Sequence, residues 1–208
     1  MFLRPPVAMA GDGPFDDDER FFEPWWPGAQ AFLRYAGGCL EMRTGHLSDP
    51  LIPFPELAGV GPQLQADSLI VEGTLLALDA EGRPDERLLR RCLSGTQVPN
   101  VEGAFVAADL PWLDGASLAD QPFVERRRRL AAILRDGPHC VLSRGLVGEG
   151  LTLAHAVAGM GLRAISARRL EARWRSGPAG DDWLRLPVLE TPAPRTRPLL
   201  ILLERLPL

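Results

Sequence analysis

Residues 21–45 read FFEPWWPGAQAFLRYAGGCLEMRTG, and this stretch carries the clearest local signal for the fold. Within it, two strand-like runs at 30–35 and 39–44 are separated by the pair Gly37-Gly38. Glycine adopts the positive φ angles that a tight two-residue turn between antiparallel strands requires. The stretch therefore predicts a β-hairpin, preceded by an aromatic and proline-rich segment.

Further strands and helices are predicted on either side of long loops. Strand-like runs occupy residues 68–78, 103–110, 164–168, 183–188 and 199–203. Helices are predicted at 85–93, where Asp85 is the expected N-cap, and at 120–135 and 154–160. Loops are predicted at the acidic segment 14–20 and at the glycine- or proline-rich segments 176–181 and 191–198. This order indicates a mixed α+β fold with largely antiparallel strands.

The helix predicted at 120–135 has the strongest end signals. Asp120 is the expected N-cap, Pro122 lies in the first turn, and Gly137 follows the C-terminal end. Four consecutive arginines occupy positions 126–129 of this helix. We interpret them as a solvated face of the helix. The alternative is that these arginines bind phosphate.

The overall composition is that of a globular protein without a strong basic field. The 208 residues suffice for one sizeable core, with 46% hydrophobic residues, 24% charged residues and a net charge of −4. Any contact with nucleic acid must then come from a local arginine patch. The sequence shows no signal peptide and no apolar run of about 20 residues, so we expect a cytoplasmic protein with no membrane partner.

No pattern of side chains indicates a metal, a cofactor or a familiar catalytic group. Cys39, Cys92 and Cys140 lack C-x-x-C spacing, the histidines are widely separated, and Ser143 does not lie in a G-x-S-x-G elbow. The chain also contains no lysine, because all 23 of its basic residues are arginine. Arginine stays protonated in proteins, so it cannot serve as the covalent nucleophile that a lysine amine provides.

Several segments along the chain form a recognisable series. They are FFEPWWPG at 21–28, MRTG at 42–45, IVEGTLLALDAEGRPD at 70–85, FVAADLPWLDGASLADQPFVERRRRL at 105–130, GLRAISARRLEARWRSG at 161–177 and DWLRLP at 182–187. In this order they resemble the motifs of ATP-dependent DNA ligases, most closely the bacterial ligase D type. The first of those motifs reads F-E-P-K-W-D-G in the family. The resemblance is collinear and extends from the start of the chain to Pro187.

The resemblance implies the nucleotidyltransferase (adenylation) domain of that family. The implied fold is two antiparallel sheets with flanking helices around a nucleotide cleft. We expect this domain to span residues 1–190. Residues 191–208 are expected to form a C-terminal tail with an apolar strand, without the OB-fold domain that follows in the family.

Aligning these motifs indicates that the reactive residues have been replaced. Trp25 stands at the position of the adenylated lysine, and Pro27 at that of the aspartate two residues later. Glu72 is retained, but Thr74 replaces the metal-associated glutamate of the same motif, and Arg163 replaces another glutamate. Further nucleotide-contacting positions carry Gln30, Ala108 and Pro187. The scaffold positions are better kept, namely Phe22, Glu23, Pro24, Gly28, Gly73, Asp109, Gly115, Gly161 and Trp183. This selective loss predicts a ligase fold with a vestigial cleft and no catalytic residue.

Three functional hypotheses follow from this interpretation. The first is an accessory factor in DNA repair or end joining that binds DNA or a repair protein. Its expected DNA or phosphate contacts are Arg43, Arg144, Arg168, Arg175 and Arg185, since arginine supplies fixed, bidentate positive charge. The second is a protein–protein scaffold, with self-association through the apolar residues 198–208. The third, an active ligase, is disfavoured by the missing lysine.

Overall fold

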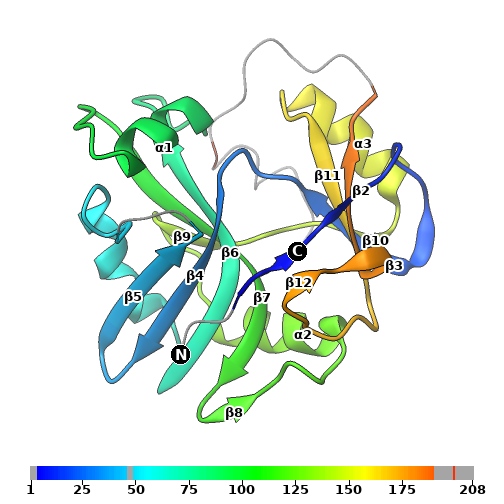
Figure 1. The fold of residues 1–208 in the computed structure, drawn as a ribbon, viewed down its shortest axis with the longest axis horizontal. Coiled ribbons are helices and arrows are strands. Elements are labelled where there is room, and N and C mark those ends of the chain that lie inside the picture. Colours follow the sequence, from blue (N-terminus) through cyan, green and yellow to red (C-terminus); the bar gives the residue numbers. More distant parts are fainter. Residues whose placement is uncertain (1–3, 46–48, 190–198, 200–208) are drawn as a thin grey trace. The chain divides into compact units, whose positions relative to one another are not determined.

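The computed structural model describes residues 4–45, 49–189 and 199, which divide into two compact units (Figure 1). Unit 1 is drawn from the segments Met1–Trp26, Ala119–Val124 and Ser143–Leu208. Unit 2 is drawn from Pro27–Leu118 and Glu125–Leu142. Each unit is built around one main sheet with few helices, so the predicted α+β class is confirmed. Among the described residues, no helix has both the length and the apolar character needed to span a membrane.

A six-stranded sheet frames unit 2. Its strands are β4 (Ala29–Ala36), β5 (Cys39–Thr44), β6 (Ser68–Leu78), β7 (Glu102–Leu113), β8 (Ala116–Ser117) and β9 (Cys140–Leu142). They lie in the order β5-β4-β6-β7-β8, and β9 runs parallel to β7 while the other neighbours are antiparallel. The predicted hairpin is confirmed as β4 and β5, with φ angles of 57° at Gly37 and 81° at Gly38.

Helices and close strand packing complete the core of unit 2. The helices are η1 (Pro55–Gln63), α1 (Glu86–Leu93) and α2 (Phe123–Ile133), of which α2 begins in unit 1. The predicted N-cap of α1 is confirmed, because the Asp85 carboxylate accepts from the backbone N–H of Arg87 at 2.7 Å. Gly73 allows β6 and β7 to approach, since a Cβ there would lie only 2.3 Å from the Val106 carbonyl oxygen.

A five-stranded sheet in the order β10-β3-β11-β13-β2 frames unit 1. Its strands are β2 (Met9–Ala10), β3 (Asp17–Pro24), β10 (Leu146–Gly148), β11 (Ala164–Arg169) and β13 (Trp183–Pro187). Only the β13–β2 pair in this sheet is parallel. Helix α3 (Gly150–Gly159) packs against β3 and β11, and its Leu153 and Val157 are buried. A short parallel pair, β1 (Pro6–Val7) with β12 (Gly177–Pro178), and the turn η2 (Gly180–Asp182) complete the unit.

Two predicted loops turn out to carry regular structure. Residues 17–20, predicted within an acidic loop, form the start of β3. The reason is that their charges are paired, with buried Arg20 contacting Asp17 at 3.0 Å and Asp181 at 2.7 Å. The segment 176–181 contributes β12 and part of η2, because the N–H of Gly177 donates to the carbonyl of Pro5.

The predicted C-terminal tail lies almost entirely outside the described residues. This applies to the loop at 191–198, to the strand at 199–203 and to self-association through 198–208. Leu199 is the single described residue there, and it is buried and helical rather than extended.

Candidate functional site

The first ligase-like motif lies where β3 ends. Pairing with β11 places Glu23 opposite Ser166. One residue beyond the strand, the backbone N–H of Trp25 donates to the carbonyl of Ala164 at 3.0 Å, which extends the pairing. Trp25, which the ligase resemblance aligns with the family's lysine, is therefore fixed on the sheet. Its side chain is a partly exposed indole.

Trp25 belongs to a row of aromatic rings and guanidinium groups, which we call the unit 1 stack. Its members, in order, are Phe123, Arg168, Trp183, Trp25 and Arg185. The guanidinium carbon of Arg168 lies 5.0 Å from the Phe123 ring centroid and 4.1 Å from that of Trp183. The Trp183 and Trp25 ring centroids are 5.8 Å apart, and the Arg185 guanidinium carbon lies 5.4 Å from the Trp25 centroid. At each end of the row, a guanidinium group therefore lies beside an aromatic ring.

Strand register explains how the stack forms. Arg168 on β11 lies directly opposite Trp183 on β13, and directly opposed residues of an antiparallel pair share a face of the sheet. Ser166 lies opposite Arg185 in the same pair, so it also shares that face. The indole Nε1 of Trp183 donates to the Ser166 hydroxyl at 2.7 Å, which fixes the orientation of the ring.

Arg168 is buried within the stack. Only 4% of its surface is exposed. The attraction between a guanidinium group and the faces of two rings offsets part of the free energy needed to remove the charge from water. Arg168, predicted as a phosphate contact, is thus placed by the structure as a packing residue of unit 1.

In unit 2 the acidic residue of the ligase-like segment 70–85 accepts a hydrogen bond from an amide. Glu72 on β6 is buried, and its carboxylate accepts from Gln30 Nε2 on β4 at 3.0 Å. Thr74 lies opposite Gln30 in the same strand pair. The motif therefore offers one carboxylate and one hydroxyl, where a hard divalent cation favours several charged oxygen ligands.

The residues present do not fit the adenylated lysine and divalent metal that the ligase resemblance implies. Trp25 has no amine, Thr74 has no carboxylate, and Arg163 is an exposed cation where the resemblance implies an acid. Among residues 4–45 and 49–189, no three His, Cys, Asp or Glu side chains are placed so that they could hold a metal ion. We therefore derive no adenylation step from this site.

Asp109 in unit 2 forms a buried ion pair with an arginine of α2. Arg126 on α2 donates from Nε to one carboxylate oxygen and from a terminal nitrogen to the other, both at 2.8 Å. Both side chains are buried, so the prediction of a solvated arginine face is wrong at Arg126. Its neighbour Arg127 is partly buried and donates to the carbonyls of β7, whereas Arg128 and Arg129 are exposed as predicted. The helix is thereby anchored to β7 by a bidentate ion pair.

The other predicted DNA contacts are divided between the two units. Arg43 is exposed on β5 of unit 2, and Arg144 is partly buried in unit 1. Arg175 is exposed in unit 1, where its guanidinium pairs with Asp120 at 2.9 Å. Arg185 is exposed, and within the part of the chain that is described no carboxylate pairs with it. The structure thus brings Arg168 and Arg185 into one stack and leaves Arg43 on a separate sheet.

Sequence reasoning missed Phe123 and Trp183 as members of this site. In the sequence, Trp183 marks only a scaffold position of the ligase resemblance. The period-two pattern of strands 164–168 and 183–188 carried a usable signal for Trp183, because pairing them antiparallel brings an arginine and a tryptophan together. Phe123 offered no such signal, since it lies on a helix.

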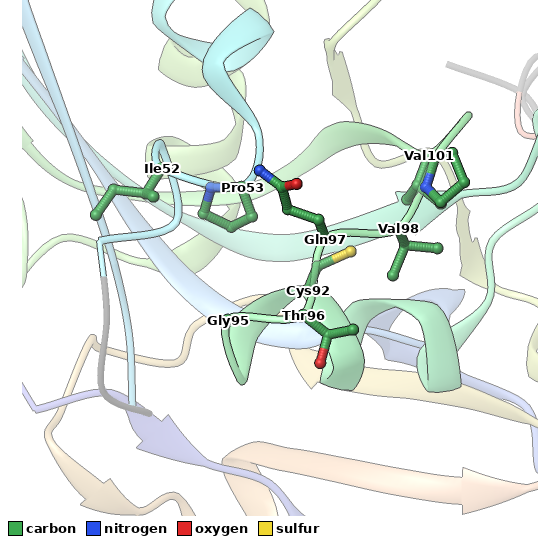
Figure 2. Close-up of a pocket in the computed structure, with 9 residues that line it drawn as sticks. Ile52, Pro53, Cys92, Gly95, Thr96, Gln97, Val98 and Val101 are labelled. Carbon is green, nitrogen blue, oxygen red and sulfur yellow. The ribbon is translucent and has the colours of Figure 1, made fainter.

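A pocket of about 710 Å³ lies in unit 2 (Figure 2). It is lined by Ile52, Pro53, Cys92, Gly95, Thr96, Gln97, Val98, Pro99 and Val101. None of these residues belongs to the ligase-like segments, so this pocket does not correspond to a nucleotide site. Burial raises the pKa of the Cys92 thiol, which keeps it protonated and weakly reactive.

Comparison with known proteins agrees with the motifs. No protein-family model matches the chain. The multifunctional non-homologous end joining protein LigD of Pseudomonas aeruginosa is 34% identical over 149 residues, which are 71% of this chain and 17% of that protein. The SPbeta prophage-derived DNA ligase-like protein LigB of Bacillus subtilis is 23% identical over 187 residues, which are 89% of this chain and 67% of LigB.

A solved structure shows the same fold. A mycobacterial DNA ligase D complexed with ATP and MES superposes with a TM-score of 0.74 at 22% identity, covering 89% of this chain and 60% of that one. The fold is thus the nucleotidyltransferase fold of ATP-dependent DNA ligases. Within that class, this chain is a ligase-like domain homologous to LigD. It spans only a minor part of LigD itself.

Proposed function

We propose that this domain binds DNA in repair or end joining without catalysing adenylation or sealing. The observation that carries the proposal is Trp25, an indole packed between Trp183 and Arg185 at the position that corresponds to the lysine nucleophile. The absence of lysine from the whole sequence supports it. The similarity to an end-joining protein supplies the biological setting.

The chemistry of the first ligation step explains why this substitution matters. In such a step a deprotonated lysine amine attacks the α-phosphorus of ATP, the bond from that phosphorus to the bridging oxygen breaks, and pyrophosphate leaves. The nitrogen loses its remaining extra proton and keeps the AMP as a phosphoramidate. The indole nitrogen of tryptophan is a donor only, and its lone pair belongs to the aromatic ring. Arg185, beside Trp25, stays protonated and cannot take over the attack. No side chain at this position can therefore form the adduct.

Binding of DNA requires less than catalysis does. Phosphate contacts need fixed positive charge within reach of the backbone, and the guanidinium group provides it in a bidentate form. Arg163 and Arg185 are both exposed in unit 1, and neither pairs with a carboxylate among the described residues. Because the net charge is −4, binding through these residues must be local and weak.

Two measurements test the proposal together. Incubation with labelled ATP and a divalent metal, followed by denaturing separation, should give no labelled protein. Titration of labelled duplex DNA should give micromolar binding at best and a log–log salt slope near −3 to −4, as expected for about four neutralised phosphates. An acid-labile, base-stable AMP adduct on this chain would overturn the non-catalytic part.

Matched double variants identify which arginines are responsible for DNA binding. Replacing Arg163 and Arg185 with alanine should reduce the magnitude of the salt slope by roughly 2. Replacing the exposed Arg128 and Arg129 on α2 removes the same charge and should leave the slope unchanged. Equal effects of the two pairs would show that binding reflects net charge and not a DNA-facing surface.

The scaffold hypothesis remains the second candidate because unit 1 exposes apolar side chains beside an edge strand. Met9 lies on β2, at the edge of the five-stranded sheet, and Val7 and Leu189 are exposed in the same unit. An unpaired edge with apolar side chains suits strand addition by a partner. If no DNA form binds even at low salt, partner binding becomes the better proposal, and Met9→Lys should then abolish capture of a purified repair partner.

A further inference from the structure

The solvent-exposed end of the unit 1 stack has an unusual composition for a sheet surface. Exposure rises along the stack from Arg168 at 4% and Trp183 at 8% to the partly exposed Trp25 and the exposed Arg185. A flat aromatic ring therefore lies, at the surface of unit 1, beside a guanidinium group that pairs with no carboxylate among the described residues. This pair combines a stacking surface with a phosphate ligand.

The inner members of the stack hold the Trp25 ring in place. Trp183 supports it at 5.8 Å and is itself fixed by the hydrogen bond to Ser166. The backbone of Trp25 is fixed by its hydrogen bond to Ala164. A ring that is already ordered loses little conformational freedom when a ligand stacks on it, so binding retains more of the contact free energy.

Arg185 is held less firmly than the rings. Its guanidinium carbon lies 5.4 Å from the centroid of the Trp25 ring, and its side chain is exposed. An exposed guanidinium group can turn to a phosphate oxygen while its aliphatic stem stays beside the indole. The two side chains can thus contact neighbouring parts of one nucleotide.

We propose that Trp25 and Arg185 together bind an unpaired nucleotide of DNA, with the base stacked on the indole and the adjacent phosphate paired with the guanidinium group. An unpaired base is required because both faces of a base inside a duplex are already covered by its neighbours. This inference rests on the proposed DNA-binding function and names the part of the DNA that is recognised. The ligand class is single-stranded DNA, or the frayed end of a duplex.

The test compares three probes on the unmodified protein at one salt concentration. They are a short oligothymidylate, an oligonucleotide of equal length in which the bases are replaced by abasic sites, and a covalently closed circular duplex, which has neither ends nor unpaired loops. Stacking of one base predicts that oligothymidylate binds about tenfold more tightly than the abasic strand. Equal affinity for these two strands would overturn the inference.

Variants then assign the effect to the two residues. Trp25→Ala should remove the tenfold preference and leave the salt slope unchanged, whereas Trp25→Phe should keep most of the preference. Arg185→Ala should reduce the salt slope on single strands by about 0.7, the value for one phosphate. Trp112→Ala, at a partly exposed tryptophan of unit 2, is the matched control and should change neither quantity. If Trp25→Ala weakens both strands equally, the indole has a packing role only and the inference fails.

The outcomes separate this inference from the function on which it rests. If no probe binds at low salt, the DNA-binding proposal itself fails. If all probes bind with a steep salt dependence and the base makes no difference, DNA binding stands and the stacking site is overturned.

Discussion

Arg168 of unit 1 and Arg126 of unit 2 are both buried, and their charges are stabilised in different ways. Arg126 in unit 2 meets the carboxylate of Asp109 through two hydrogen bonds of 2.8 Å. Arg168 in unit 1 lies between the rings of Phe123 and Trp183, at 5.0 and 4.1 Å. The first pair is a directional charge-assisted contact and the second is a broad electrostatic attraction to ring faces. Asp109 thus has a structural role in unit 2, whereas Trp25 in unit 1 lies between an aromatic ring and a guanidinium group.

Breaking the ion pair of unit 2 should have the largest effect. Asp109→Ala leaves the Arg126 charge buried without its carboxylate, and removing one partner of a buried pair lowers the free energy of unfolding by about 3–5 kcal/mol. Denaturant unfolding monitored by circular dichroism measures the loss. Arg128→Ala on the exposed face of α2 is the control, and we expect it to change stability by less than about 0.5 kcal/mol. A loss below about 1 kcal/mol for Asp109→Ala would contradict the anchoring role.

Removing the buried cation of unit 1 should have a smaller effect. Arg168→Met keeps an unbranched chain between the two rings and removes the guanidinium group. The expected loss is about 1–2 kcal/mol, the size of desolvated cation–π contacts. Arg168→Lys should fall between the two, because an ammonium keeps the charge without planar stacking. A loss as large as that of Asp109→Ala would mean that the rings are not the main partners of this cation.

Introducing a lysine at position 25 tests whether this one residue prevents adenylation. Trp25→Lys should lower the free energy of unfolding by about 1–2 kcal/mol, because the ring burial is lost and the new ammonium lies beside Arg185. We expect no adenylation by this variant, since Thr74, Arg163 and Pro187 still lack the family's accompanying groups. Labelled ATP and denaturing separation test this directly. An adduct on Trp25→Lys would show that one substitution alone silenced the site.

The smallest effect is expected at the exposed carboxylate that pairs with Arg20 and Arg169. The pKa of Asp181 is lowered, chiefly by its hydrogen bond from Arg169. A lowered folded-state pKa gives stability that is complete above the unfolded pKa of about 3.9 and is lost as the pH falls through the folded value. Because 61% of the Asp181 side chain is exposed, the effect should stay below about 1 kcal/mol. Urea midpoints of the parent and Asp181→Asn should therefore differ at neutral pH and converge in acid.

The sequence was informative wherever local chemistry decides the structure. The glycine pair at 37–38 predicts the hairpin, Asp85 predicts a helix start, and the motif order predicts the ligase fold. All three are confirmed. The failures involve contacts between distant residues. The sequence predicts a solvated Arg126 on α2, because its partner Asp109 lies 17 positions away on β7. Arg20 was predicted in a loop, because its partner Asp181 lies 161 positions away.

The site was only partly predictable for the same reason. The motif order predicts that Trp25 stands at the nucleophile position, and a backbone hydrogen bond fixes Trp25 on the sheet. Whether the new side chain points into solvent or joins a stack depends on β13, which lies far along the chain. The identity of residue 25 therefore predicts, as a hypothesis, that adenylation is lost. Strand register is needed to find which side chains pack around Trp25.

The closely spaced indoles of the unit 1 stack have an optical consequence. Two indoles whose centroids are 5.8 Å apart at an interplanar angle of 36° are near enough for their electronic transitions to mix. Mixed transitions in a fixed chiral arrangement give a paired positive and negative band in the ultraviolet dichroism spectrum. The two indoles thus report on the packing of unit 1 without any attached dye. The paired band should vanish when either indole is replaced or when unit 1 loses its packing.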